Sequence, residues 1–228
     1  MITRLTIVRY PSWFGWAGFL SMALFRLPLW LRKDILFWKL MGCGRNGSFD
    51  KTPDWRQWAV LEIIQDKHVP LSRFLINWWQ LFGCEKWELI LRPIEGHGLW
   101  DGKEVFGVLP KQTDYTGRIA VMTRATIRIS QLSRFWQHVD AVAQRMSGAP
   151  GFITSVGIGE VPWIKQATFS IWESKEDMKA FAYRLQEHAE VVRKTRQEKW
   201  YSEELFVRFQ IIDSKGSLKG YDPIKRNP

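Results

Sequence analysis

Cysteine and histidine are scarce in this chain of 228 residues, which has only two cysteines and four histidines. Cys43 and Cys84 lie far apart and lack the spacing of a zinc site, so we expect reduced thiols in the cytoplasm. The sequence also lacks a phosphate-binding loop and a Gly-x-Ser-x-Gly motif. The Gly-x-Gly strings at 42–44 and 157–159 do not extend to a dinucleotide fingerprint, and we interpret both as turns.

Negative charge is also in short supply, with 23 acidic residues against 33 lysines and arginines and a net charge of +10. Such a balance suits nucleic acid, an anionic membrane surface or an acidic small molecule as a partner. No run of five or more basic residues and no zinc-finger or RNA-recognition pattern occurs. We therefore expect no nucleic-acid partner.

Aromatic residues, in contrast, are abundant: the chain has 14 tryptophans and 14 phenylalanines, and 46% of its residues are hydrophobic. This composition argues against a disordered chain. Because each aromatic ring buries a large area, the excess fits either a wide core or a site for a bulky apolar ligand. Composition alone does not separate these two interpretations.

An apolar stretch at residues 13–25 follows a short predicted strand, and Arg26 and Pro28 then interrupt it. A membrane-spanning helix needs roughly 20 predominantly apolar residues, so this stretch is short for one. No small-residue cleavage site follows, which argues against a secretory signal. Two interpretations stay open: a buried helix, or a helix that lies in the membrane interface with help from Arg26, Arg32 and Lys33.

The chain contains an internal repeat. Residues 85–102 align without a gap with residues 203–220, which lie 118 positions further along, and both copies combine an apolar strand with a Gly-rich turn. The paired positions include Glu85 with Glu203, Ile94 with Ile212, Glu95 with Asp213, Gly98 with Gly216 and Gly102 with Gly220. A shorter match of 37–44 with 152–159 sets Cys43 opposite Ile158, which favours a packing role for that cysteine.

Hydrophobic periodicity predicts the same order of elements in each half: strand, helix, strand, strand, helix, strand. Strands are predicted near 5–10, 35–41, 58–64, 87–94, 120–128, 153–158, 167–172 and 205–212. Helices are predicted near 13–25, 71–82, 132–146 and 175–197.

This order is that of the ferredoxin-like unit, so we predict an α+β fold of two tandem ferredoxin-like βαββαβ repeats. The first repeat is expected at residues 1–106 and the second at 118–228, with 107–117 as the linker between them. Each antiparallel sheet would carry its helices on one face. We expect the two bare faces to pack sheet to sheet as an α+β barrel with room for a ligand inside.

Among the four histidines, His188 is the best candidate for a ligand. It lies at the edge of the apolar stripe of the last predicted helix, in line with Phe181. An imidazole that faces an apolar interior either hydrogen-bonds a neighbour or binds something there. His97 aligns with a lysine in the repeat and is interpreted as a surface turn residue, while His68 and His138 are expected to be exposed.

From Met122 onward the chain resembles the spheroidene monooxygenases, a haem-containing family that oxidises carotenoids. The matching stretches are residues 123–128 (TRATIR), 157–163 (GIGEVPW), 166–172 (QATFSIW) and 200–205 (WYSEEL). The first half matches more loosely, mainly at 37–40. The resemblance implies a protein that binds haem b.

A more distant similarity concerns the iron ligand. In the ferredoxin-like haem-degrading monooxygenases, a strand that ends in Trp is followed by a Lys/Ser turn and by the helix that carries the iron-binding His. Here Trp172 and Lys175 precede Phe181 and His188 in the same arrangement. Together the two resemblances imply His188 as the iron ligand, with Glu187 or Glu190 as the acceptor that would hold its other nitrogen.

The remaining candidates rest on strand alternation. Arg124 and Arg128 are expected on the same side of one strand, where they either bind the haem propionates or point to solvent. Gln166 and Ser170 alternate likewise on the neighbouring strand and could hydrogen-bond the substrate or the oxidant, so they join Arg124 as candidate catalytic residues. Two further cations are candidates for the propionates: Lys165 and Arg193.

The family resemblance implies a haem-dependent monooxygenase that oxygenates an apolar substrate, a carotenoid or another isoprenoid, in a closed pocket lined by aromatic residues. Its partners would be that substrate and an electron donor, in the cytoplasm; contact with the inner membrane surface and a homodimer both stay open. Three alternatives share the fold: another haem enzyme such as an aldoxime dehydratase or a haem-degrading enzyme, a haem carrier or sensor, and a cofactor-free oxygenase.

Overall fold

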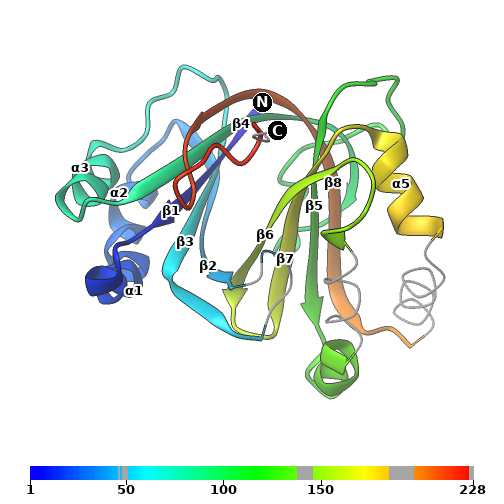
Figure 1. Ribbon diagram of the computed structural model, residues 1–228, viewed down its shortest axis with the longest axis horizontal. Coiled ribbons are helices and arrows are strands. Elements are labelled where there is room, and N and C mark those ends of the chain that lie inside the picture. The colour runs from blue at the N-terminus through cyan, green and yellow to red at the C-terminus, as the bar shows by residue number, and fades with distance from the viewer. Residues whose placement is uncertain (46, 48–50, 138–145, 185–197, 226–228) are drawn as a thin grey trace.

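The strands of the computed structural model close into one antiparallel barrel, with the helices outside it (Figure 1). The structure describes residues 1–228 except 46, 48–50, 138–145, 185–197 and 226–228. The strands are β1 (Ile2–Arg9), β2 (Ile35–Gly44), β3 (Pro53–Ile64), β4 (Glu85–Gly98), β5 (Ile119–Ile127), β6 (Phe152–Val161), β7 (Lys165–Trp172) and β8 (Tyr201–Gly216). The helices are α1 (Gly15–Leu24), α2 (Arg26–Trp30), α3 (Arg73–Leu81) and α5 (Lys175–Arg184).

The order of strands around the barrel is β1-β3-β2-β6-β7-β5-β8-β4. The first four strands of the chain therefore lie side by side as β4-β1-β3-β2, and the last four as β8-β5-β7-β6. A long pairing of β4 with β8 joins the two halves on one side, and the pairs Gly42–Gly159 and Cys43–Ile158 of β2 and β6 join them on the other. The predicted α+β class is confirmed, and every predicted strand is present.

The interior of the barrel is a packed apolar core. All eight strands contribute side chains to it, because alternate residues along each strand point inward. The largest members are Trp87, Trp100, Phe106, Phe169 and Phe209, each buried. The expected α+β barrel is therefore confirmed, with the two sheets joined edge to edge. The expectation of room for a ligand inside it is wrong, because side chains of the described residues occupy the space that the strands enclose.

The helices cover the outer face of the barrel. In the first half, α1, α2 and α3 pack on the sheet through a second apolar cluster that includes Phe25, Leu29, Leu75 and Trp79. In the second half, α5 packs on the sheet through a third cluster. The predicted helices at 132–146 and 175–197 extend into residues 138–145 and 185–197, which lie outside the described residues. No helix among the described residues has the length and hydropathy that crossing a membrane requires.

The two repeated segments make matching contacts. After β4 the chain turns at residues 99–103, and the carboxylate of Glu203 accepts hydrogen bonds from two backbone N–H groups of that turn, at 3.0 and 2.7 Å. After β8 the chain turns at residues 217–221, and the carboxylate of Glu85 accepts two such bonds, at 2.7 and 2.6 Å. Each half of the barrel thus anchors the turn of the other half.

Candidate functional site

One row of residues crosses five strands on the outer face of the barrel, the four strands of the second half and β4 of the first half. Strand pairing joins Gly157 on β6, Thr168 on β7, Thr123 on β5, Phe206 on β8 and His97 on β4. Their neighbours along β5 to β8 point into the barrel, so the row faces outward. We call this row the outer shelf. Adjacent strands lie about 4.8 Å apart, so the shelf spans roughly 19 Å.

Short side chains line the middle of the outer shelf. Thr168 is buried, and its hydroxyl oxygen has no hydrogen-bond partner among the described residues. Leaving such a group unpaired costs about 1–3 kcal/mol. Thr123 on β5 pairs with Thr168 and is exposed. It lies on the same face of β5 as Ile119 and Val121, which α5 covers. Among the described residues, the middle of the shelf therefore carries only short strand side chains and offers the buried hydroxyl of Thr168 no partner.

Two apolar clusters border the outer shelf on either side. Along β5, Ile119 and Val121 belong to the cluster beneath α5, and Ala125 and Ile127 belong to another. Thr123 lies between these two pairs. The first cluster also contains Trp172, Met178 and Phe181, and the second contains Phe135, Trp136 and Trp200. A flat apolar ligand on the shelf would thus have aromatic side chains at both of its edges.

The corresponding position in the first half is filled. There Gly42 pairs with Trp58, and Trp58 pairs with Val8 on its other side. The corresponding residues of the second half are Gly157, Thr168 and Thr123 in the same order. The Trp58 side chain is buried, and α1 packs so closely on it that a Cβ at Gly18 would lie 2.1 Å from its Nε1 atom. A tryptophan that packs tightly against a helix thus lies in one half at the strand positions where the other half has threonines.

Gln166 and Ser170, two of the residues predicted from alternation, lie on the same outward face as Thr168. Both are buried. Gln166 donates a hydrogen bond from Nε2 to the carbonyl oxygen of Val161 at 3.1 Å, and the hydroxyl of Ser170 accepts one from Nε1 of Trp172 at 2.9 Å. The structure therefore places both side chains beside the outer shelf, and their catalytic role stays a prediction.

A buried ion-pair group next to the outer shelf was missed by the sequence reasoning. Arg208 on β8 pairs with Glu95 on β4, and Nζ of Lys175 at the start of α5 lies 3.7 Å from the same carboxylate. All three side chains are buried, and burial lowers the pKa of Arg208. The Arg208 guanidinium also lies over the ring of Phe206, at 4.8 Å. The available signal was the charge of Arg208 within the mostly apolar stretch at 205–212.

His97 lies at one end of the outer shelf. Its ring stacks on that of Phe206, with the centroids 5.7 Å apart and the planes at 28°, and the side chain is exposed. The expectation of a turn residue is wrong in one respect, because His97 belongs to β4 and pairs with Phe206. Its exposure agrees with the expectation.

Arg124 lies on the other face of the sheet, at the mouth of the barrel, where it is almost completely buried. Its guanidinium contacts three carboxylates: Glu203 at 2.5 Å, Glu160 at 3.2 Å and Asp101 at 3.5 Å. It also lies over the ring of Trp100, at 5.2 Å. We call this group, together with Lys39 and Lys165, the mouth cluster.

Lys165 and Lys39 complete the mouth cluster. Lys165 lies 2.7 Å from Asp101, and Lys39 contacts Asp101 and lies 2.7 Å from Glu160. Partial burial alone would raise the pKa of Asp101, but the hydrogen bonds from Lys165 and Lys39 outweigh it and hold that pKa at about 2. Three cations thus face three carboxylates, and the charges balance within the cluster.

Arg128 does not share a strand face with Arg124, and that expectation is wrong. β5 ends at Ile127 after a register shift, so the alternation on which the expectation rested stops before Arg128. The Arg128 side chain is exposed and donates a hydrogen bond to the carbonyl oxygen of Tyr201 at 3.2 Å. Solvent exposure was the second interpretation that the sequence left open for this residue.

His188, Arg193 and His138 lie outside the described residues, so their roles stay predictions. The described part of α5 ends at Arg184, four positions before His188. His68 is exposed, as expected. The described residues contain no group of three or more His, Cys, Asp or Glu side chains placed to hold a metal ion.

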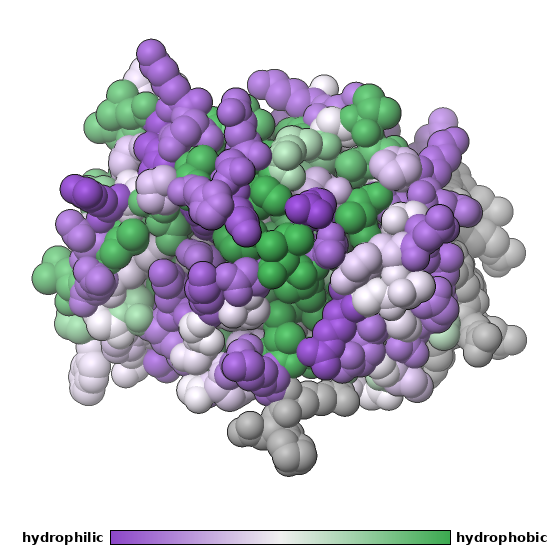
Figure 2. Space-filling view, turned by 90° about the horizontal axis from the view of Figure 1, so that it is seen from above, coloured by the Kyte–Doolittle hydropathy of each residue, from purple (hydrophilic) through white to green (hydrophobic). Residues whose placement is uncertain are grey.

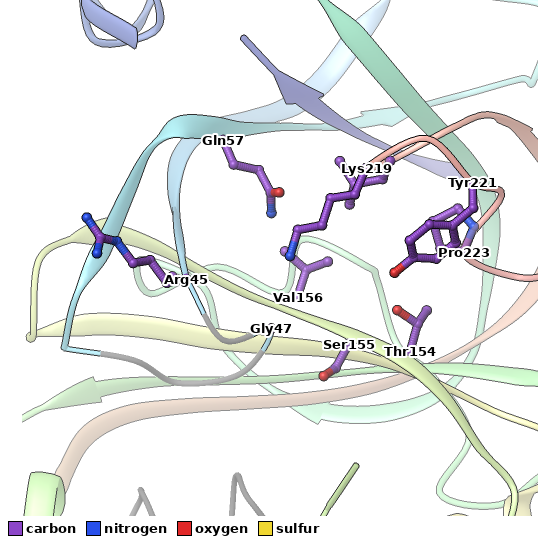
Figure 3. Close-up of a pocket in the computed structure, with 11 residues that line it drawn as sticks. Arg45, Gly47, Gln57, Thr154, Ser155, Val156, Lys219, Tyr221 and Pro223 are labelled. Atoms are coloured by element: carbon purple, nitrogen blue, oxygen red, sulfur yellow. The ribbon is translucent and has the colours of Figure 1, made fainter. Parts of the chain in front are cut away.

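A small polar cavity lies at the opposite end of the barrel from the mouth cluster, between β3, β6 and the turn at 217–221 (Figure 3). Lys219 extends over Val156 toward Gln57, while Arg45 points away from the centre. The cavity holds about 50 Å³, whereas sites for drug-sized ligands hold about 300–1,000 Å³. It has room for a few water molecules and not for a large ligand.

Comparison with known proteins gives close sequence relatives. The chain is 33% identical over 193 residues to the spheroidene monooxygenase of Cereibacter sphaeroides, a match that covers 82% of this chain and 59% of that protein. It is 31% identical over 211 residues to the spheroidene monooxygenase of Rhodobacter capsulatus, with 90% of this chain and 87% of that protein covered. The chain thus spans less than two thirds of the first relative and most of the second.

No protein-family signature matches the chain. Among solved structures, an aldoxime dehydratase superposes with a TM-score of 0.58 over 93% of this chain and 81% of the other, at 12% sequence identity. This likeness concerns the fold alone.

Proposed function

The chain belongs to the spheroidene monooxygenase family, and from this premise we propose that it is a haem-dependent monooxygenase acting on an apolar substrate, a carotenoid or another isoprenoid. The observation that supports the proposal most is the outer shelf. It combines an unpaired buried hydroxyl at Thr168, an exposed Thr123 and aromatic clusters at both edges, and it occupies the place that Trp58 fills in the first half.

The residues around the outer shelf suit a haem. A flat macrocycle needs a broad surface without protruding side chains, and Gly157, Thr168 and Thr123 provide one. The hydroxyl of Thr168, which has no partner among the described residues, would be available there to hydrogen-bond a polar group of the reactants. The helix predicted at 175–197, which would carry the iron ligand, begins with α5, and α5 packs on this same face, so His188 remains our candidate for the iron ligand and haem b for the cofactor.

The haem propionates need cations that the protein has not already neutralised. The charges of the mouth cluster balance, and Arg124 lies on the opposite face of the sheet from the outer shelf. Arg208 and Lys175 share the single carboxylate of Glu95, which leaves one net positive charge beside the shelf. We therefore assign the propionates to Arg208 and Lys175 in preference to Arg124, Arg128 and Lys165, with Arg193 as a further candidate.

When bound, the haem would supply the redox chemistry of oxygenation. The chain would supply orientation and exclusion of water. The hydroxyl of Ser170 and the amide of Gln166 are buried on the shelf side, where they can hydrogen-bond polar groups of the reactants, and the aromatic clusters would hold an apolar chain against the sheet. Oxygenation by dioxygen needs an electron donor as a second partner.

The duplicated fold is part of the proposal. We infer that the chain arose from two copies of one ferredoxin-like unit, with the boundary in the segment 107–117. The support is the identical strand order in the two halves and the matching contacts of Glu85 and Glu203 with the turns of the opposite half. The two free cysteines, one buried and one partly buried, favour a reducing compartment such as the cytoplasm.

The test is an absorption spectrum of the protein purified from haem-replete cells. We expect a Soret band in the wild type and its loss, or a change of ligation state, in His188→Ala. The matched control is His68→Ala, which removes an exposed histidine and should leave the spectrum unchanged. A wild type without haem would overturn the cofactor proposal, and an unchanged His188→Ala spectrum would move the ligand to another residue, with His97 the next to replace.

A further inference from the structure

A face of α1 and α2 exposes large apolar side chains to solvent. Residues 13, 16, 20, 24, 27 and 31 follow one another at helical spacing, and all six are exposed tryptophans or leucines. Trp13 is 85% exposed, Trp16 58% and Leu27 62%. The opposite side of the same segment, which includes Ala17, Ser21, Phe25 and Leu29, is buried against the sheet and α3. The segment is therefore apolar on its outer side as well as on its inner side.

Neighbouring elements extend this apolar surface. Phe19 contacts Trp55 of β3, with ring centroids 6.1 Å apart, and Trp55 is itself 54% exposed. Phe25 contacts Phe74 of α3, which is also exposed. We call these exposed residues the aromatic face: Trp13, Phe14, Trp16, Phe19, Leu20, Leu24, Leu27, Trp30, Leu31, Trp55 and Phe74. Single exposed apolar residues are common, but so many large ones gathered on two short helices and their neighbours mark a surface that binds something.

Positive charge borders the aromatic face. Arg26, Lys33 and Arg73 are exposed on the same helices or directly after them. The chain has no acidic residue before Asp34, so the whole segment from Met1 to Lys33 carries only positive side-chain charge. In Figure 2, the side of the molecule where α1 to α3 lie carries hydrophobic and hydrophilic side chains next to one another.

We propose that the aromatic face docks on the surface of an anionic lipid bilayer. A bilayer interface is the environment in which tryptophan rings are enriched, since their apolar body and polar N–H group suit the headgroup level. An amphipathic helix with basic residues beside an apolar face lies in the plane of such an interface, with its apolar side chains about 5–10 Å deep. Anionic headgroups would meet Arg26, Lys33 and Arg73.

Charge favours a bilayer over a second copy of the chain. In a symmetric dimer through this face, Arg26, Lys33 and Arg73 of one copy would approach the same residues of the other, because such an interface pairs one patch with itself. Like charges at an interface oppose association. A lipid surface that carries negative charge has no such conflict.

The inference stands apart from the haem proposal. It rests on side chains of the first half of the barrel, whereas the outer shelf lies mainly on the second half. If both hold, a bilayer that dissolves the apolar substrate would deliver it to a docked enzyme.

The test is co-sedimentation of the full-length protein, as purified and without added substrate, with lipid vesicles. One set contains phosphatidylcholine alone, and the other contains phosphatidylcholine with phosphatidylglycerol. We expect binding to the anionic vesicles that weakens at high salt. Trp16→Glu combined with Leu27→Glu should weaken that binding at least about tenfold, because two charges replace two inserted apolar groups. The control Ile129→Glu changes a side chain that is 77% exposed in the second half and should bind as the wild type does.

A second variant and its control test the same proposal in case Trp16→Glu combined with Leu27→Glu fails to fold. Arg26→Glu with Lys33→Glu reverses two exposed charges beside the aromatic face and should also weaken binding about tenfold. Lys103→Glu with Lys179→Glu reverses two exposed charges elsewhere and should not. Absence of wild-type binding to anionic vesicles, or equal binding by wild type and Arg26→Glu/Lys33→Glu, would overturn the proposal. Self-association that Trp16→Glu combined with Leu27→Glu abolishes, without vesicle binding, would assign the face to a second copy instead. None of these outcomes depends on haem, so the vesicle experiment and the Soret measurement test the two proposals separately.

Discussion

Arg124 shows how burial and partners together decide what a charged residue can do. Its side chain is almost completely buried, and such burial of a lone cation would cost several kcal/mol. Three carboxylates and the face of Trp100 surround it, and their charge is shared in turn with Lys39 and Lys165. Its partners are therefore within the protein, which makes a structural role the simplest account of this arginine.

The mouth cluster predicts how stability depends on pH. The pKa of Asp101 is held at about 2 in the folded protein, below its ordinary value, chiefly by Lys165 and Lys39 against the opposing effect of partial burial. A group with a lowered folded pKa contributes stability that is present above its unfolded pKa and is lost as the pH falls through its folded pKa. The urea concentration at the unfolding midpoint of the wild type should therefore decrease as the pH is lowered from about 4 to about 2.

Asp101→Asn is the informative variant for this pH dependence. Asn accepts the positive φ of 50° found at this position, so the turn should persist. The variant should be less stable than the wild type near neutral pH and should lose less stability on acidification to about pH 2. Asp66→Asn, in an exposed loop, serves as the control. An acid-induced loss as large in Asp101→Asn as in the wild type would contradict the account.

Single residues also show where prediction from sequence succeeds and fails. Alternation along β7 correctly predicted that Gln166 and Ser170 share a face, because a regular strand has a fixed period of two. The same rule failed for Arg128, because β5 ends in a register shift that no local pattern announces. Arg208 and Glu95 were missed because their burial depends on a pairing of strands more than 100 positions apart.

At the scale of elements, the repeated segments are the best-predicted part of the chain. The two segments of the gapless alignment, 85–102 and 203–220, each contain a strand, and the two strands pair with each other. Each segment also contains a turn whose backbone N–H groups donate hydrogen bonds to the glutamate of the other segment. Four glycines at matching positions adopt positive φ, which explains why the turns need them: Gly98, Gly102, Gly216 and Gly220. The interruption of the first apolar stretch was also visible, since α1 ends at Leu24 and Pro28 lies early in α2.

The matching glutamates should differ in their contribution to stability. Glu85→Ala removes hydrogen bonds to the N–H groups of Lys219 and Gly220 and to the hydroxyl of Ser217, at a cost of about 1–2 kcal/mol. Glu203→Ala also deprives the buried Arg124 of a carboxylate, so it should cost about 3 kcal/mol or more. Equilibrium urea unfolding measures both.

The glutamine variants serve as controls for this comparison. Glu85→Gln retains an acceptor for the turn and should lose less than Glu85→Ala, and the same order should hold at Glu203. Equal losses for Glu85→Ala and Glu203→Ala would show that the ion pair with Arg124 adds nothing to stability.

At the scale of the whole molecule, a barrel was predicted from the sequence, but the filled interior and the strand pairs that close the barrel were not. An inward-facing apolar residue at every second position is required by two sheets packed face to face and equally by one closed barrel, so the pattern does not distinguish them. Closure depends on a few hydrogen-bonded pairs, such as Gly42–Gly159 and Cys43–Ile158, and on the long β4–β8 ladder. Because side chains fill the interior of the barrel, the candidate site lies on its outer face and not inside it.

Asymmetry between two similar halves therefore carries the functional proposal. In the first half, Trp58 and α1 fill the outer face of the sheet, whereas the described residues at the matching positions of the second half are the short side chains of Thr168 and Thr123. If this difference creates the haem site, a tryptophan introduced at one of these threonine positions should prevent haem from binding. Thr123 is the position of choice because its exposed side chain can be enlarged without disturbing the core.

The most direct test is the haem content per polypeptide of Thr123→Trp, beside the wild type and the control Thr116→Trp, which enlarges an exposed threonine in the segment between β4 and β5. We expect full loading of the wild type and the control. Thr123→Trp should retain the far-ultraviolet circular dichroism of the wild type and bind haem at least about tenfold more weakly, since the ring would occupy the space of the ligand. Full loading of Thr123→Trp would place the haem elsewhere and contradict the account.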